Sequence, residues 1–556
     1  MQVLALLATA ATLGLMLAVG LTSYFGTDEF NYAHAAWAIA QGQQPYRDFF
    51  LHHFPGIMQL GSLVFRLWDD PRAMDGLRWL MVPFWLLAAV AILLLNRRSG
   101  VWPALLSIPL LGSLGAWVQY GTQFRPDPVA IALFLSSLLL ATGHSPRARL
   151  RSFLAGACLV FACWSSQKVI VYGLPLFLGW LVAMVQWRRR PGEPRLVSEP
   201  REFALGVLAA AIPIAGYLTI THNWRPWWEW CLYGGIVHET FYPKRSPWIS
   251  LQPTLRQNWH VLGLALLGFL WMARGVWNRG ARAAFSDPDV LLLACAVTTG
   301  ASYFMQQAPY GWSLIAPLAF VAVLAARGLG EVVQYAIGMS SPDRRRLIIG
   351  VAGIGIAFAS VPLSAVEMLR TRHLRARQEA MLANVARLTA PTDPAYDNTG
   401  YYVARPHAHF FFWTDQSARI VHRERLIREV PTAILQGGVT LRIRDRRDLE
   451  LPPGLQAFLN DHFVCVLGDV CLWGHTYAGL GQKPAAFTAV RDARYYVTPA
   501  SAISGRQLRI DGRPVEQPTF HLTRGQHEIS WSGGAPAPEL SLLWLPRTGE
   551  LLEPGR

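Results

Sequence analysis

Long apolar runs dominate the chain from its N-terminus to about residue 366 and are absent beyond it. Many are about 17 to 25 residues long, the length of a helix that crosses a bilayer. This pattern predicts a polytopic helical membrane region followed by a polar tail. We expect membrane spans at about 3–22, 77–95, 101–119, 127–143, 152–167, 169–186, 203–221, 258–273, 289–305, 313–327 and 347–366.

Arginines between these runs set the expected orientation. They gather in alternate short loops, and loops rich in Lys and Arg stay in the cytoplasm. A cytoplasmic N-terminus and an odd number of spans, about eleven, place all of the basic loops inside. The segments 23–76, 120–126, 222–257 and 306–312, and the whole tail, then lie outside. The basic loops are Asn96–Arg98, Arg147–Arg151, Arg188–Arg190, Arg274–Arg282 and Arg344–Arg346.

Composition agrees with a membrane protein. Of the 556 residues, 52% are hydrophobic and 15% are charged, against about 25% charged in soluble domains. The net charge of +15 comes from the basic loops, so we do not expect nucleic acid as a partner. No small-residue cleavage site follows the first apolar run, which we therefore expect to be a retained span. Cys465 and Cys471 could pair if the tail lies in an oxidising compartment.

Two outer segments are more apolar than ordinary loops. Residues 29–41 and 55–68 repeat apolar positions at helical spacing, which predicts two amphipathic helices in the membrane interface. Residues 222–257 are rich in Trp and Tyr, typical of an aromatic belt or a lid that faces lipid.

The tail divides into two predicted domains. Residues 371–480 alternate short β-rich runs with helical ones, indicating a small α/β domain. Residues 481–556 contain strand-like runs with turns at Asp511-Gly512 and Arg524-Gly525, indicating a β-sandwich with hairpins. With the membrane domain 1–370, the chain is expected to have three domains and a mainly α fold.

The acidic pair Asp28-Glu29 directly follows the first span. One interpretation is structural, because Thr27 or Asp28 could cap the next helix through its side-chain oxygen. The other is catalytic, because a carboxylate at a helix N-terminus stays ionised and can accept a proton from a hydroxyl.

Further polar residues follow in the outer segments. Asp48 and His53 lie near Pro45-Tyr46 and Pro55-Gly56, where a turn with a solvated Asp48 and a polar contact by His52-His53 is the simpler interpretation. Tyr310 lies in the turn 306–312 and could bind a ligand or belong to the aromatic belt.

Arg125, Asp127 and Lys168 bring charges to the ends of outer spans. Pro126 and Pro128 stiffen the tight hairpin, in which Arg125 and Asp127 could pair with each other. Lys168 could extend toward the headgroups or meet a phosphate. Carboxylates and cations together at a lipid–water boundary suit group transfer from a lipid phosphate. The glycines at 350, 353 and 355 lie inside an apolar run and indicate helix packing, and the sequence contains no P-loop.

These residues resemble the GT-C superfamily of membrane glycosyltransferases, in particular bacterial relatives of protein mannosyltransferases and aminoarabinose transferases. The likeness rests on the first span with Asp28-Glu29, the Ala-rich helix ending at Gly42, and Pro45, Tyr46 and Asp48. Arg125-Pro126-Asp127 is similar to a second acidic motif, and Lys168 and Pro309-Tyr310 to later landmarks. The resemblance covers about residues 1–370.

The resemblance implies an enzyme of the bacterial inner membrane that takes a sugar from a polyprenyl phosphate outside the cytoplasm, with inversion. Asp28 would be the catalytic base, Glu29 would orient it, and Asp127 would support the site or hold a divalent metal where one is used. Lys168 and Arg125 would meet the lipid phosphate. The acceptor could be a glycan, a lipid or a protein. His53 departs from the pattern of some relatives, which leaves its role open.

Two other functions remain open at this point. A non-enzymatic transporter or scaffold for lipid-linked glycans would carry polar residues near the bilayer midplane, whereas here they cluster at one edge. A glycan-binding protein that acts through its tail would not need Asp28.

Overall fold

The computed structural model describes residues 2–68, 70, 72–142, 146–189, 195–233, 244–284, 286–337, 366, 370, 372–414, 416–480, 483–503, 507–533 and 537–554. The chain forms two compact units. The helical unit comprises Met1–Phe25, Leu51–Val64 and Met74–Arg375. The α/β unit comprises Gly26–Phe50, Phe65–Ala73 and Ala376–Arg556.

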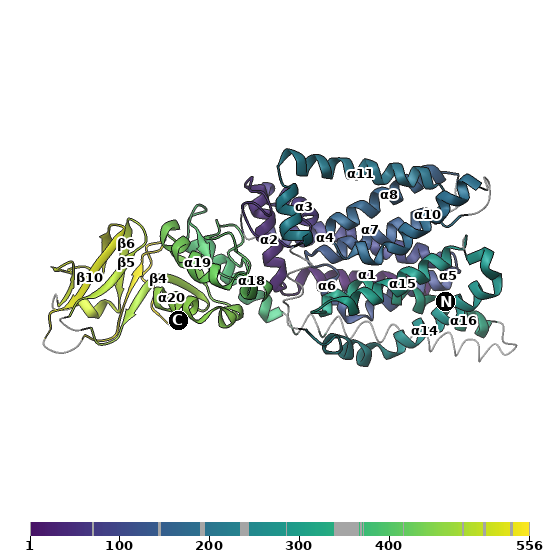
Figure 1. Ribbon diagram of the computed structural model, residues 1–556. Coiled ribbons are helices and arrows are strands. Elements are labelled where there is room, and N and C mark those ends of the chain that lie inside the picture. Colours follow the sequence, from purple (N-terminus) through teal and green to yellow (C-terminus); the bar gives the residue numbers. More distant parts are fainter. Residues whose placement is uncertain are drawn as a thin grey trace. The chain divides into compact units, whose positions relative to one another are not determined.

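Apolar helices build the helical unit (Figure 1). Among the described residues, seven helical segments are long and apolar enough to cross a membrane, so the chain is an integral membrane protein. The helices are α1 (Gln2–Thr22), α3 (Gly56–Leu67), α4 (Ala73–Arg97), α5 (Val101–Gly112), α6 (Gly115–Tyr120), α7 (Pro126–Ala141), α8 (Ala148–Ser165), α9 (Val169–Tyr172), α10 (Leu174–Arg189), α11 (Pro200–Ile220), α12 (Trp224–Trp227), α14 (Trp248–Ala284), α15 (Pro288–Met305) and α16 (Ile315–Ile337), with a π-helix η1 (Trp228–Tyr233) and a 3-10 helix η2 (Gly311–Leu314).

Ten of the eleven predicted spans coincide with helices, and the eleventh, 347–366, lies outside the described residues. Two of the predicted spans are interrupted. The span at 101–119 is broken at Leu114, which has an extended backbone between α5 and α6. The span at 169–186 divides into α9 and α10 at Gly173. The span at 258–273 lies within the longer α14, which has non-helical torsions at Asn258.

Helix α16 forms the centre of the helical unit. It packs against α5, α7, α14 and α15, and 89% of the apolar 18-residue window within Gly311–Ala336 is buried. Small residues permit its close approach to α14. A Cβ on Gly268 would lie 2.0 Å from the Leu324 carbonyl oxygen, and one on Gly328 would lie 2.2 Å from that of Leu264. Glycine is therefore required at both positions for this packing.

A buried arginine caps the C-terminal end of α1. Arg78, on α4, is fully buried. Its guanidinium donates to the carbonyl oxygens of Gly20, Ser23 and Tyr24 at 2.6, 2.8 and 2.7 Å. Helix C-termini leave carbonyl groups unpaired and carry partial negative charge, so a cation here satisfies both. This cap fixes the chain just before it passes from the helical unit into the α/β unit, between Phe25 and Gly26.

Two sheets organise the α/β unit (Figure 1). The larger has the order β1-β2-β4-β11-β6-β9, and β3 also pairs with β4. The smaller has the order β5-β10-β7-β8. Only β1 and β2 are parallel among the described pairs. The strands are β1 (Ala395–Tyr396), β2 (Leu441–Ile443), β3 (Phe463–Leu467), β4 (Val470–Tyr477), β5 (Ala485–Ala489), β6 (Ala493–Thr498), β7 (Leu508–Ile510), β8 (Arg513–Pro514), β9 (Thr519–Leu522), β10 (Gly525–Trp531) and β11 (Leu540–Trp544).

Helices in this unit are α2 (Thr27–Ala40), α18 (Gln416–Val421), α19 (Arg423–Gly437) and α20 (Pro453–His462). The 3-10 helices are η3 (Arg446–Glu450) and η4 (Ala500–Ile503), and residues 372–388 are also helical. A disulfide joins Cys465 to Cys471 on the neighbouring strands β3 and β4.

The larger sheet contains strands from both predicted tail domains. β11 pairs with β4 in antiparallel register, Leu540 opposite Tyr477. The predicted boundary at residue 480 therefore separates strands that share one sheet, and the division into domains 371–480 and 481–556 stays a prediction. Asp511-Gly512 forms the predicted hairpin between β7 and β8. Arg524-Gly525 does not form one, because β9 pairs with β6 whereas β10 pairs with β5 and β7.

We predict that Arg78→Met strongly destabilises the helical unit. The apolar stem is kept, but the hydrogen bonds to three buried carbonyl groups are lost, which should cost about 3 kcal/mol. Thermal unfolding in detergent measures the effect. The matched variant Arg72→Met removes an arginine that is exposed and paired with Asp70, and should leave the midpoint nearly unchanged. Equal shifts in the two variants would contradict the capping role.

Candidate functional site

Helix α2 carries the first acidic motif and is buried within the α/β unit. Every residue from Glu29 to Ala38 is buried. Aromatic side chains of the segment 401–413 cover it, with Phe30 against Tyr401 at 4.6 Å and Tyr32 against Trp413 at 6.1 Å between ring centroids. The helix is thus not the interfacial amphipathic helix that its spacing predicted. Its polar face also packs against protein, which periodicity alone cannot reveal.

The two acidic residues of α2 have different surroundings. The Glu29 carboxylate is buried and accepts a hydrogen bond of 2.7 Å from the Gly26 backbone N–H. Glu29 and Gly26 therefore form the N-terminal cap that the sequence analysis assigned to Thr27 or Asp28. Asp28 lies in the first turn, with Oδ1 3.4 Å from Nη2 of Arg447. The Glu29 carboxylate thus caps the helix, whereas the Asp28 carboxylate faces the Arg447 guanidinium.

Behind Arg447 lies a buried polar cluster that the sequence analysis did not identify. The Asp397 carboxylate accepts hydrogen bonds from the backbone N–H groups of Thr399, Gly400 and Tyr401 at 2.8, 2.5 and 2.6 Å. Burial, followed by the nearby charge of Asp445, raises the pKa of Asp397 to about 8. Gly400 has a positive φ of 87°. The run Asp-Asn-Thr-Gly at 397–400 is a turn signal that could have indicated this loop.

Asp48 stabilises the turn in which it lies. Its carboxylate accepts from the Gln44 backbone N–H at 2.7 Å and pairs with Arg47 at 3.0 Å. Although burial opposes ionisation, the hydrogen bond from Arg47 and the one from Gln44 hold the pKa of Asp48 below its usual value. In these contacts Asp48 acts as a turn residue, and a role toward a phosphate stays a prediction.

His34, on α2, contacts His407 and the backbone of Val403. His34 Nε2 lies 3.1 Å from His407 Nδ1, and His34 Nδ1 lies 2.7 Å from the Val403 carbonyl oxygen. Burial lowers the pKa of His407 to about 4. Burial, with His407 as the second cause, also lowers the pKa of His34 well below its usual value. Both rings are therefore neutral at pH 7.

In the helical unit, Asp127 and Lys168 form an ion pair. Lys168 Nζ lies 3.1 and 3.3 Å from the two carboxylate oxygens, and the side chains are 29% and 14% exposed. Pro126 starts α7, so Asp127 lies in its first turn, while Lys168 precedes α9. Lys168 Nζ also lies 3.5 Å from Ser313 Oγ, which in turn donates to Gln306 at 2.8 Å. The Arg125 guanidinium lies over an aromatic ring, and its internal pair with Asp127 stays a prediction.

That ring belongs to a stack of alternating aromatic and cationic groups. The Arg125 guanidinium lies 4.4 Å from the centre of the Trp312 ring. Trp312 stacks on Tyr310 at 4.4 Å with an interplanar angle of 9°, and Arg245 lies 4.6 Å from the centre of the Tyr310 ring. Cations over aromatic faces are held in place without losing their charge. Arg245 and Trp312 were not identified from the sequence, where they fell among many aromatic-belt residues.

His53 belongs to the same region of the helical unit. Its Nδ1 lies 3.5 Å from Gln167 Nε2. Burial first, then His52, Lys168 and Arg125, keep the pKa of His53 well below its usual value. The ring is neutral, and the two cations are near enough to affect it.

A site for a divalent metal would need several ligating side chains close together. Within the described part of the chain, no group of three or more His, Cys, Asp and Glu side chains has an arrangement that could hold a metal ion. At Asp127 the ammonium group of Lys168 lies at the carboxylate. The residues at Asp127 thus suit a carboxylate–lysine pair and not a metal-ligand set.

The eight predicted site residues form two groups. Arg125, Asp127, Lys168, His53 and Tyr310 gather in the helical unit, linked through Ser313 and Trp312. Asp28, Glu29 and Asp48 lie on and after α2 in the α/β unit, where Arg447 and Asp397 join them.

Comparisons with solved structures show a GT-C glycosyltransferase fold over most of the chain. ArnT from Cupriavidus metallidurans bound to undecaprenyl phosphate has a TM-score of 0.54 at 15% identity, covering 84% of this chain and 97% of that one. Its apo state has a TM-score of 0.53 at 14% identity. The Archaeoglobus fulgidus oligosaccharyltransferase tethered with an acceptor peptide has a TM-score of 0.50 at 13% identity, covering 82% of this chain and 72% of that one. No protein-family model and no curated protein sequence matches the chain.

We predict energetic coupling between Asp127 and Lys168. Each of Asp127→Asn and Lys168→Met leaves a partly buried charge unpaired, so the double variant should be more stable than the two single effects predict, by about 1 kcal/mol or more. Thermal unfolding of the four proteins measures it. The exposed pair Arg225–Glu229 is the control and should show no measurable coupling. Additive effects at Asp127 and Lys168 would contradict the pairing.

We predict that His407 makes stability depend on pH. The folded pKa is about 4 and the unfolded value about 6.5, so the unfolded chain binds the proton first as pH falls. Stability is therefore complete above pH 6.5 and is lost toward pH 4, by about 1.4 kcal/mol per pH unit.

The variant His407→Gln should lose this dependence, so its unfolding midpoint should fall less than that of the wild type between pH 6.5 and 4.5. His521→Gln, which removes an exposed ring, should retain the wild-type slope. Parallel curves for His407→Gln and the wild type would show that His407 titrates alike in both states.

Proposed function

We propose that this protein is a GT-C-type glycosyltransferase that moves a sugar from a polyprenyl phosphate to an acceptor hydroxyl outside the cytoplasm, with inversion. The observation that carries the proposal is the cationic cluster of the helical unit, in which Lys168 pairs with Asp127 and the guanidinium groups of Arg125 and Arg245 lie over the rings of Trp312 and Tyr310. It occurs in a fold for which ArnT has been solved with undecaprenyl phosphate.

The cluster suits the phosphate of the donor. Lys168 is positioned by Asp127, and Arg125 and Arg245 by the faces of Trp312 and Tyr310. Cations held in this way can stabilise the negative charge that develops on a leaving phosphate, at no further cost in reorganisation. The neutral His53 adds a hydrogen-bonding group without adding charge.

Asp28 suits the acceptor side. Its carboxylate would take the proton of the acceptor hydroxyl as that oxygen attacks the anomeric carbon of the sugar. The bond from the anomeric carbon to the phosphate oxygen then breaks, and polyprenyl phosphate leaves with the electron pair. Arg447, 3.4 Å from Asp28, would orient the carboxylate, a role given to Glu29 from the sequence. Glu29 would instead keep α2 capped.

The topology proposed with this function has about eleven spans, a cytoplasmic N-terminus and an α/β unit outside the bacterial inner membrane. The disulfide Cys465–Cys471 supports an oxidising compartment for that unit. The positions of the arginine-rich loops support the same orientation.

We predict that Asp28→Asn lowers transfer by about 10²- to 10⁴-fold, the usual contribution of a general base. The amide keeps the shape of the side chain but cannot accept the proton. Release of undecaprenyl phosphate from undecaprenyl-phosphate-linked sugars, by the full chain in lipid vesicles with envelope extracts as acceptor, measures transfer.

Asp70→Asn is the matched control, because that carboxylate pairs with Arg72 at the surface; it should keep full activity. Asp28→Asn with wild-type activity would remove Asp28 as the base. Release by no form of the protein, together with transport of the lipid-linked sugar across the vesicle membrane, would favour a transporter.

A further inference from the structure

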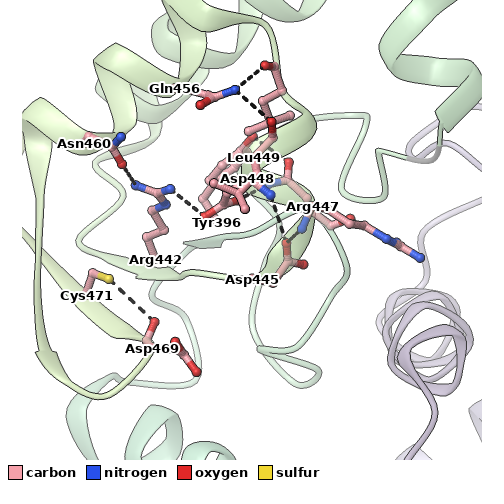
Figure 2. Close-up of polar contacts among 12 residues, drawn as sticks. Tyr396, Arg442, Asp445, Arg447, Asp448, Leu449, Gln456, Asn460, Asp469 and Cys471 are labelled. Atoms are coloured by element: carbon pink, nitrogen blue, oxygen red, sulfur yellow. Dashed lines mark hydrogen bonds and ion pairs between the residues drawn. The ribbon is translucent and has the colours of Figure 1, made fainter.

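The short helix η3 has two sides. Arg447 extends from one side toward Asp28. From the other side, Asp448 pairs with Arg442 on β2 at 2.6 Å. Figure 2 shows the Arg447 guanidinium pointing away from this turn, whereas the Arg442 guanidinium points toward the turn from β2. The proposed reaction uses only the Arg447 side.

A cavity of about 400 Å³ opens on the Arg442 side. Its volume lies in the range of small-molecule sites, about 300–1,000 Å³. Its lining includes Arg442, Arg444, Arg446, Asp448, Gln456 and Asn460. A second cavity of about 450 Å³ shares Arg444, Asp445, Arg446 and Asp469 with it.

A buried arginine lines the cavity. Arg442 is 2% exposed, and its two terminal nitrogens donate to Asn460 at 3.3 Å and to Asp448 at 2.6 Å. These contacts tie Asn460 of α20 and Asp448 of η3 to β2, so the cavity wall is held by hydrogen bonds.

The charged side chains around the cavity differ in whether another side chain of the protein pairs with them. Asp448 is paired with Arg442, and Asp469 is paired with Arg377 at 2.5 Å. Asp445 accepts from the backbone N–H groups of Arg447 and Asp448. Asp448 and Asp469 are therefore paired with arginines of the protein, while the exposed arginines 444 and 446 add positive charge at the opening.

Amide groups complete the lining. Gln456 and Asn460 are four residues apart on α20, so they lie on the same face of the helix. Asn460 accepts from Arg442 through Oδ1, and Gln456 donates through Nε2 to the carbonyl oxygens of Leu449 and Leu451. The amide nitrogen of Asn460 and the amide oxygen of Gln456 then offer a donor and an acceptor to sugar hydroxyls. The exposed Leu449, which also lines the cavity, presents an apolar surface to a sugar ring.

We propose that this cavity binds a saccharide residue that carries a carboxylate or a phosphate group. The hydroxyls meet Asn460 and Gln456, and the anionic group meets Arg444 and Arg446. Its role as a subsite for the acceptor glycan rests on the proposed function, whereas the binding itself does not. Because η3 carries both Asp448 and Arg447, a saccharide here would fix the turn that orients Asp28.

Binding to the purified full-length protein tests the proposal. The probes are glucuronate, glucose 6-phosphate, neutral glucose and inorganic phosphate, titrated by calorimetry in detergent. We expect one or both acidic sugars to bind at least about tenfold more tightly than glucose and than inorganic phosphate, because hydroxyl contacts and charge-assisted hydrogen bonds act together. A preference between the two acidic sugars identifies the anionic group.

The variant Arg444→Gln/Arg446→Gln should weaken binding of the acidic sugars by about tenfold or more. The control Arg494→Gln/Arg513→Gln removes two exposed arginines of the same unit and should bind as the wild type does. Unaltered binding by the first variant, equal binding of glucose, equal binding of inorganic phosphate, or no binding at all would each overturn the proposal.

The inactive variant Asp28→Asn separates this proposal from the proposed function. It should still bind the acidic sugar with wild-type affinity, because Asp28 does not line the cavity. If the wild type binds the sugar but never releases undecaprenyl phosphate, the proposed function fails and the saccharide site stands. If transfer occurs without sugar binding, only the site fails.

Discussion

The burial of α2 inside the α/β unit is the constraint on which the rest of the site depends. A helix that follows the first membrane span would be expected to remain with the membrane, yet Tyr401, Phe412 and Trp413 enclose it, and His34 and His407 meet beneath it. Glu29 is used to cap this helix. Asp28 is therefore held in a fixed position beside Arg447, where a carboxylate on a free interfacial helix would have no set partner. The helix that carries Asp28 is held by contacts with residues more than 360 positions later in the sequence, such as that between His34 and Val403.

The two polar groups of the protein handle charge in different ways. In the helical unit, Lys168 pairs with Asp127, and Arg125 and Arg245 lie over aromatic rings; cations held in this way favour an anion. In the α/β unit, the Arg447 guanidinium faces Asp28, and burial raises the pKa of the nearby Asp397 to about 8. The helical unit thus offers cations to an anionic group, whereas the α/β unit offers a carboxylate, Asp28, that can accept a proton.

The apolar runs predicted the positions of ten helical segments because length and apolar composition are local properties, and seven of the described segments are long and apolar enough to cross a membrane. Arg125, Asp127, Lys168 and Tyr310 were identifiable for a related reason, since charged or polar residues at the ends of apolar runs stand out. The contacts of α2 could not be predicted, because a helix buried by a distant segment has the same local spacing as one lying in lipid. The continuity of the larger sheet was hidden similarly: β4 and β11 are separated by more than 60 residues and pair by backbone hydrogen bonds, which leave little trace in side-chain pattern.

The same reasoning explains why the most informative residues of the α/β unit were missed. Arg442, Asp448 and Asn460 are common polar residues in a tail that is rich in arginine, and nothing in their spacing marks them. The significance of Arg442 and Asp448 comes from burial, since a buried guanidinium needs hydrogen-bond partners. Arg442 donates to Asp448 of η3 and to Asn460 of α20, so one buried side chain joins β2, η3 and α20. The same short helix η3 carries Arg447 toward Asp28. A ligand in the cavity beside Arg442 would therefore act on the turn that holds Arg447, because both arginines are tied to η3.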